Sequence, residues 1–291
     1  MEIIKMYELP QPTEGPFDIF DCLAIGSKFY VHLKSEDVIF SVNFFDYVYR
    51  SKGVIASLNR LPVLKQIYSY GMTKQEMSDL YDKRLVQSVA GRKLYNKIMG
   101  SAINKTCPLC SLRLVSTLDH YLPKAHYPQY ALSRINLYPA CFECNKAKLD
   151  KINNNKNEQT FHPYFDKLSG TPWLSADLIM DTGVTLQYYV NNSVSNDFYL
   201  KDRMCYHFKK LGIDELYTTY ASSEFSSIKD LLQNIYNSKG ADGIRKYLNR
   251  KWVSSSKSNK NGWKTIFYKT LMNSKAFCGG GFKKISIHQF P

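Results

Sequence analysis

The chain has 291 residues, enough for one large domain or two to three small ones. Hydrophobic residues make up 44% of it, with 22 Tyr and 16 Phe, a composition that excludes an intrinsically disordered chain. The net charge of +14 indicates an anionic partner such as nucleic acid, an acidic protein or a membrane surface. The sequence has neither an apolar run of membrane-spanning length nor the apolar stretch of a secretory signal, so we expect a cytoplasmic protein without a membrane partner.

The first 70 residues mix aromatic-rich apolar runs such as VIFSVNFFDYVY with turns, and their pattern favours neither helix nor strand. We assign residues 1–90 to an aromatic-rich N-terminal region. Its aromatic content suggests that it docks a partner protein.

Two helices are predicted before the first cysteine pair. Thr73 and Glu76 of TKQE form a capping box, and apolar residues follow at helical spacing as far as Val86. A second helix is predicted over 92–99, with Gly100 ending it.

The chain contains seven cysteines, and an odd number without a secretion signal argues against a disulfide framework. Four of them form two CxxC pairs, a spacing typical of a structural zinc site with four thiolate ligands: Cys107, Cys110, Cys141 and Cys144. Such a zinc ion has no open coordination position, so we expect it to hold shape without doing chemistry. A redox role is disfavoured because the pairs lack a thioredoxin-like βαβ context. We expect the remaining cysteines to be small buried residues: Cys22, Cys205 and Cys278.

The segment between and just after the two pairs is predicted to form two short strands and a helix. VSTL (115–118) is strand-prone, INLY (135–138) is a second candidate strand, and a helix is expected from about Cys144. Four polar residues lie where these elements end or begin: Asp119, His120, Asn136 and Asn145.

Each of these four side chains has a chemical role available to it. Asp119 and Asn145 offer hard oxygen ligands suited to Mg²⁺ or Mn²⁺. His120, with an ordinary pKa of about 6.5, can be neutral and take a proton from water. Asn136 is expected to orient the imidazole by hydrogen bonding. We expect three nearby lysines to neutralise phosphates: Lys124, Lys146 and Lys148.

Other aromatic and histidine side chains around the motif are expected to fill space. His162, in HPYFD, is expected to pack against the motif rather than to contact phosphate or metal. Tyr127, Tyr130 and Tyr138 are expected to fill the core or the surface rather than to stack on bases.

The C-terminal region, 171–291, is predicted to be a β-hairpin followed by helices. The hairpin is expected over 177–190, where DTG separates two apolar runs. A flexible break is expected at 254–262. From Gly243 to the end there are eleven Lys or Arg and no Asp or Glu, so this part is a cationic surface. It is either a solvated face or a face that binds phosphates or an acidic partner.

The Asp-His pair at 119–120, Asn136 and Asn145 inside two CxxC pairs resemble the HNH (ββα-metal) endonucleases over about residues 92–166. This resemblance implies an α+β protein with a zinc-stapled ββα-metal core in 91–170, embedded in mostly helical flanking regions. It also implies that His120 is the general base, that Asn136 positions it, and that Asp119 and Asn145 hold a catalytic Mg²⁺ or Mn²⁺. Many members have histidine at the last position, and Asn145 is a weaker ligand.

A looser resemblance, carried by TLDHYLPK, NLYPACFECNKAK, HPYFD and a late GWKTIFYKTLMNSKAFCGGGF, is to HNH effectors of Septu-type anti-phage systems. Similar proteins occur beside retrons. This resemblance implies an SMC/ABC-like ATPase partner, and in retron systems a reverse transcriptase with its RNA-DNA. The substrate remains open between DNA and tRNA. The alternative is a catalytically inactive zinc-framed module that binds nucleic acid or acts as an adaptor.

Overall fold

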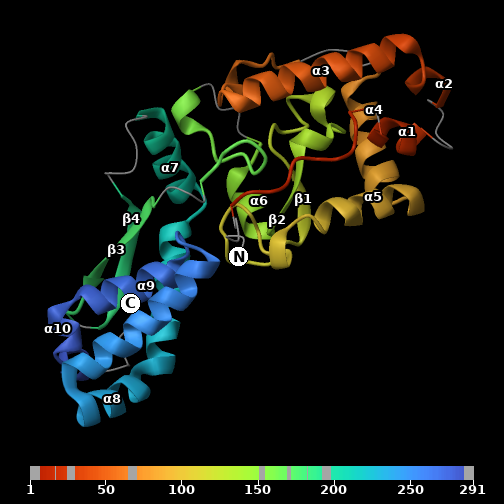
Figure 1. Ribbon diagram of the computed structural model, residues 1–291. Helices are drawn as coiled ribbons and strands as arrows, with labels where there is room; N and C mark the ends of the chain where they lie inside the picture. Colours follow the sequence, from red (N-terminus) through yellow and green to blue (C-terminus); the bar gives the residue numbers. More distant parts are fainter. Residues whose placement is uncertain are drawn as a thin grey trace. The chain divides into compact units, whose positions relative to one another are not determined.

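The computed structural model describes residues 7–16, 18–24, 30–64, 71–150, 155–168, 172–181, 183–191 and 198–284 (Figure 1). Over these residues the fold is mixed α+β, mostly helical with two small antiparallel sheets, and this confirms the predicted fold class at that level. The chain divides into two compact units, Met6–Leu168 and a second that comprises Ser169–Pro291 with Met1–Lys5. The regions 1–90 and 91–170, which were predicted to be separate, therefore lie largely within one unit. Within the described residues, no helix combines the length and hydropathy needed to cross a bilayer.

The N-terminal part of the first unit is helical where it is described. The two helices predicted before the first cysteine pair are confirmed, whereas the helices within the first 70 residues were not favoured by the sequence pattern. Its elements are α1 (Asp18–Ala24), α2 (Tyr30–Leu33), α3 (Glu36–Val54), α4 (Lys74–Asp79), a π-helical segment (Leu80–Val86) and α5 (Val89–Met99). In α3 the buried residues are spaced three or four apart: Val38, Val42, Asp46, Tyr49 and Gly53. Burial of this face explains why a segment rich in strand-prone aromatic and β-branched residues is helical, since packing overrides weak local preference.

The predicted capping box at the start of α4 is confirmed. The Glu76 N–H donates to the Thr73 hydroxyl at 3.2 Å, and the Thr73 N–H donates to the Glu76 carboxylate at 3.0 Å. The α-helix ends earlier than predicted, because the chain continues from Leu80 as a π-helix. Gly91 in α5 allows this segment to approach closely, since a Cβ there would lie 1.9 Å from the Arg84 carbonyl oxygen.

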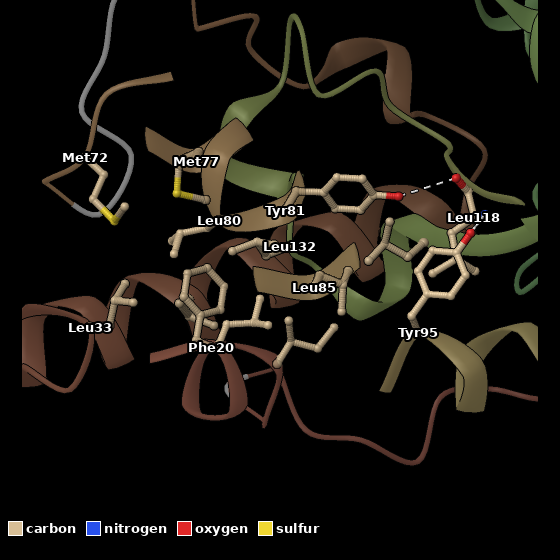
Figure 2. Packing of buried hydrophobic residues seen from close by; sticks show 14 of the residues in the cluster. Phe20, Leu33, Met72, Met77, Leu80, Tyr81, Leu85, Tyr95, Leu118 and Leu132 are labelled. Atoms are coloured by element: carbon tan, nitrogen blue, oxygen red, sulfur yellow. Dashed lines mark hydrogen bonds between the residues drawn. The ribbon is translucent and has the colours of Figure 1, made fainter. Parts of the chain in front are cut away.

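The core of this unit joins the helices to the first sheet. Figure 2 shows the side chains of Tyr81 and Tyr95 reaching Leu118, and the two hydroxyls also hold its backbone. The Tyr81 hydroxyl donates to the Leu118 carbonyl at 3.5 Å, and the Leu118 N–H donates to the Tyr95 hydroxyl at 3.2 Å. The position of this short strand is therefore set by the helical core.

The first sheet pairs β1 (Thr117–His120) with β2 (Leu137–Ala140), and α6 (Phe142–Lys148) follows at once. The predicted order of two strands and a helix is confirmed, although both strands lie about two residues later than expected. Asp119 and His120 thus belong to β1 itself, opposite Tyr138 and Leu137. The long connection between the strands contains two 3-10 turns, Pro128–Tyr130 and Arg134–Asn136.

The second unit contains the predicted hairpin, formed by β3 (Leu174–Ile179) and β4 (Thr185–Val190). Between residues 198 and 284, which the structure describes, four α-helices follow: α7 (Phe198–Lys210), α8 (Ile213–Ser258), α9 (Trp263–Asn273) and α10 (Lys275–Cys278). The hairpin packs on α8 and α9, which also pack on each other (Figure 1). The predicted break at 254–262 is wrong in its extent, because α8 continues to Ser258. Instead α8 is interrupted at Gly240, which has φ 59° and ψ −155°, a conformation open essentially to glycine alone.

Candidate functional site

The four predicted zinc ligands meet in one buried cluster. The sulfur atoms of Cys107, Cys110, Cys141 and Cys144 all lie within 4.8 Å of one another. A tetrahedral zinc ion with Zn–S bonds of about 2.3 Å requires sulfurs about 3.8 Å apart, so the cluster has the dimensions to hold one. Each pair is shaped by a backbone N–H donated to sulfur, from Arg113 to Cys110 at 3.5 Å and from Cys144 to Cys141 at 3.4 Å.

The thiols of this cluster share their protons unequally. Hydrogen bonding with the Cys107 thiol lowers the pKa of Cys110, and it lowers that of Cys141 to about 6. Hydrogen bonds with the neighbouring thiols raise the pKa of Cys107 and Cys144. In this cluster two sulfurs with a lowered pKa accept hydrogen bonds from two thiols. A divalent ion would replace those thiol protons on binding.

The cysteines outside the cluster differ from one another. Cys278 is buried, as predicted, whereas the prediction for Cys205 is wrong because its side chain is exposed on α7. The side chain of Cys22 lies outside the described residues.

His120 is held at one edge of its ring by the backbone. Its Nε2 lies 2.8 Å from the carbonyl oxygen of Ala131, and its ring centroid lies 4.5 Å from that of Tyr81. Because a carbonyl can only accept, Nε2 must carry the ring proton, which leaves the lone pair on Nδ1. The side chain is 7% exposed and lines an open cavity of about 390 Å³.

The surroundings of His120 favour its neutral form. Burial lowers its pKa from 6.5 to about 3, and the positive charges of Lys124 and Lys148 act in the same direction. The bond to Ala131 opposes these effects. The imidazole is therefore unprotonated, and able to accept a proton, across the neutral pH range.

Asp119 carries the most tightly held carboxylate of the cavity. The Tyr138 hydroxyl donates to its Oδ2 at 2.7 Å, and the ammonium of Lys148 lies 3.2 Å from each of its two oxygens. Lys148 also donates to the carbonyl of His120. Burial and the neighbouring carboxylate raise the pKa of Tyr138 well above its ordinary value, so its hydroxyl stays protonated as a donor.

Asn136 makes its hydrogen bonds to the loop backbone and not to the imidazole, so the expectation that it orients the ring by a direct hydrogen bond is corrected. Its Oδ1 accepts from the Leu122 N–H at 2.7 Å, and its Nδ2 donates to the carbonyls of Leu122 and Tyr130, each at 3.0 Å. The fully buried amide therefore fixes the backbone on both sides of the loop. Ala131, whose carbonyl holds His120, follows Tyr130 directly, so Asn136 acts on the histidine through the loop.

His162 is buried behind Asn136, in agreement with the packing expectation. Its Nδ1 accepts from the Tyr164 N–H at 3.2 Å, so Nε2 carries the proton that it shares with the Tyr49 hydroxyl at 3.1 Å. That hydroxyl donates in turn to Asn136 Oδ1 at 2.9 Å. The His162–Tyr49–Asn136 relay, as we call these three side chains, joins three distant parts of the chain. Sequence reasoning missed Tyr49, which no motif marks among 22 tyrosines.

Asn145 and the three lysines are also placed around the cavity, where they take different roles. Asn145 and Lys146 project from α6 and line it, and Lys146 is exposed. Lys124 lines it too, but is paired with Asp82 at 2.9 Å and lies over the Tyr81 ring. Lys148 is turned inward and only 9% exposed, so it does not present its charge to a phosphate.

The same cavity brings together the donors expected for a catalytic metal. Asp119 and Asn145 both line it and offer hard oxygens of the type that Mg²⁺ and Mn²⁺ prefer. The donor set thus fits a divalent ion in kind. Both oxygens of the carboxylate, however, already lie against the Lys148 ammonium.

Comparison with known proteins shows a distant similarity to a phage protein. The chain is 25% identical over 223 residues to Protein ea31 of Escherichia phage lambda, an alignment that covers 72% of this chain and 75% of that protein. No family model matches the chain. No solved structure matches it either.

Proposed function

We propose that the unit Met6–Leu168 is a metal-dependent HNH-type endonuclease that hydrolyses phosphodiester bonds of nucleic acid. The observation that carries this proposal is the state of His120. Its Nε2 is anchored to a carbonyl, and its unprotonated Nδ1 belongs to a ring that lines a cavity shared with Asp119 and Asn145. A fixed neutral imidazole beside hard oxygen donors is the arrangement required for activating water next to a phosphate.

The reaction follows from the groups that line the cavity. Nδ1 of His120 takes a proton from water, and the resulting hydroxide attacks phosphorus in line with the leaving oxygen. The P–O3′ bond breaks, so the products carry a 5′ phosphate and a 3′ hydroxyl. A divalent ion held by Asp119 and Asn145 would stabilise the charge that develops on the leaving 3′ oxygen. Attack by water does not need the 2′-hydroxyl, so the chemistry suits both DNA and RNA.

Positive charge on the molecule supports nucleic acid as the substrate. Lys146 is exposed at the cavity, where a phosphate would sit. In the second unit, ten side chains of the basic segment after Asp242 are exposed: Arg245, Lys246, Arg250, Lys251, Lys257, Lys260, Lys264, Lys269, Lys275 and Lys283. Such a surface binds phosphate backbones without regard to sequence.

The proposed function is tested by incubating the zinc-loaded chain, with its partner ATPase where one is needed, with plasmid DNA and with tRNA in the presence of Mg²⁺ or Mn²⁺. We expect cleavage that is lost with a chelator of these ions, and ends that ligate directly because they carry 5′ phosphate and 3′ hydroxyl. Ends with a 3′ phosphate or a cyclic phosphate would contradict water attack at this site. Binding of both polymers without cleavage of either, in the presence of the partner, would favour the inactive binding module.

The ATPase partner implied by the looser resemblance remains part of this proposal, and α3 supports it. This helix exposes three aromatic residues along one face, Phe40 at 73%, Phe44 at 52% and Tyr47 at 70%, and the first two rings stack 6.4 Å apart. Solvent-facing aromatic rings in a row are typical of a surface that a protein partner covers.

We expect Phe40→Ser combined with Phe44→Ser to abolish co-purification with the proposed SMC/ABC-like ATPase partner. Zinc content should stay unchanged, because neither ring belongs to the buried core. Val89→Ser is the matched control, since Val89 is 81% exposed on α5 and away from this face. Undiminished co-purification of the double variant would show that the ATPase does not dock on α3.

A further inference from the structure

Lys148 is a charged residue that the fold buries against oxygen acceptors. An ammonium has three N–H donors, and three acceptors surround this one: Asp119 Oδ1, Asp119 Oδ2 and the carbonyl oxygen of His120. Lysine is almost never buried without such pairing. The side chain therefore binds groups in the wall of the cavity, unlike Lys146, which lies two residues earlier on α6 and is exposed.

The backbone next to Lys148 indicates that this position is imposed on the chain. Leu149, directly after it, has φ 59° and ψ −177°, a conformation that is costly for any residue except glycine. The side chain of Leu149 is 60% exposed, so packing of its own side chain does not explain the strain. Strained residues persist where their surroundings hold them, and the adjacent held group is the Lys148 ammonium.

Among the described residues that line the cavity, Asp119 is the only buried carboxylate, since Asp150 is exposed. A divalent ion needs a carboxylate oxygen at about 2.0–2.1 Å for Mg²⁺. The Lys148 ammonium lies 3.2 Å from each oxygen. It therefore occupies space that such an ion would need, and its positive charge repels the ion.

We propose that Lys148 is a tethered cation that competes with the divalent metal for Asp119. The inference rests on the proposed function and adds a regulatory property to the same site. In the resting protein Lys148 neutralises the carboxylate and keeps the cavity closed to metal at low concentration. A divalent ion binds only by displacing the ammonium, so Lys148 sets the metal concentration at which the nuclease becomes active. Asn145, an uncharged ligand, offers little to offset this competition.

The test measures Mn²⁺ binding to the zinc-loaded full chain without nucleic acid, by electron paramagnetic resonance of free Mn²⁺. We expect Lys148→Met to bind Mn²⁺ at least tenfold more tightly than the unmodified chain. The matched control is Lys146→Met, for which we expect a change of less than twofold, because Lys146 does not touch Asp119. Adding Asp119→Asn to Lys148→Met should abolish the gain, which assigns it to this carboxylate.

Folding of each variant is checked by its zinc content and its near-ultraviolet circular dichroism. If Lys148→Met does not fold, Lys148→Gln replaces it, since an amide removes the charge but still donates to the surrounding oxygens.

Equal or weaker Mn²⁺ binding by the folded variant would overturn the proposed competition between Lys148 and the metal. Tighter binding without cleavage by any variant would refute the nuclease and leave this inference standing. Cleavage with unchanged Mn²⁺ affinity would refute this inference alone.

Discussion

Replacing His120 with alanine is expected to lower the rate of nucleic-acid cleavage by about 100- to 10,000-fold, the range that a positioned general base contributes. The loss follows because no other group described around the cavity combines an unprotonated nitrogen with a fixed orientation. Zinc content should be unchanged, since the ring does not contact the cysteine cluster. The rate is measured with excess enzyme at saturating Mn²⁺, so that weaker metal binding does not contribute.

The matched control is His126→Ala. His126 lies in the loop that follows β1 and is half-buried, but it does not line the cavity. We expect its cleavage rate to stay within about twofold of the unmodified chain, as surface changes away from a site usually do. A His120→Ala protein that cuts at the normal rate would remove the imidazole from the mechanism.

The low pKa of His120 also predicts how the stability of the chain changes in acid. Above pH 6.5 His120 is neutral in the folded and in the unfolded chain, so it adds no pH dependence to stability. Between pH 6.5 and about 3 the unfolded chain binds a proton that the folded chain does not, so the free energy of unfolding falls as the pH falls. His120→Gln removes this contribution, and its denaturation midpoint should decline less steeply over that interval.

Replacing Cys141 with serine is expected to release the zinc ion and unfold much of the first unit. Zinc binding at a site with four thiolates is worth about 10–16 kcal/mol at neutral pH, comparable with the whole stability of a domain, about 5–15 kcal/mol. Cys141 has a further local role, because it follows β2 directly and its sulfur accepts the Cys144 N–H at the start of α6. Loss of the ion therefore separates the helix that carries Asn145 and Lys148 from the strand that carries Asp119.

Zinc is measured by mass spectrometry and by a colorimetric chelator, and unfolding by circular dichroism. The three tryptophans lie at 173, 252 and 263, all in the second unit, so their fluorescence reports separately on that unit. We expect its unfolding midpoint to change little in Cys141→Ser. Cys205→Ser, at an exposed thiol, is the control and should keep both zinc and stability. A Cys141→Ser protein that retains zinc and its unfolding midpoint would contradict the structural role of the cluster.

Local patterns predicted the parts of the fold that local chemistry controls. The capping box at Thr73 depends on residues three apart, and the hairpin after Leu174 depends on two apolar runs joined by a turn. The cluster of four cysteines was also predictable, since the spacing of the two pairs alone indicates a shared metal ion. The helical state of α3 was not, because its residues have mixed local preferences and only the burial of one face decides between them.

The positions of the candidate site residues were predictable, but several of their partners were not. Lys148 was expected to face phosphate because it shares a helix with Asn145, yet its partner Asp119 lies 29 residues away. Asn136 was expected to contact the imidazole, whereas a backbone carbonyl at Ala131 does so. Sequence patterns show side chains and not the backbone atoms exposed by a loop, so contacts of this kind appear only once the chain is folded.

The His162–Tyr49–Asn136 relay has a consequence for how this chain tolerates genetic change. Each hydroxyl, amide and ring nitrogen in it is oriented by its neighbour, across separations of 113 and 87 residues. A single substitution leaves a buried polar partner without its hydrogen bond, while a matched pair of substitutions does not. Variation at these three positions should therefore be epistatic, and drift in descendants of this chain should exchange them jointly or leave all three in place.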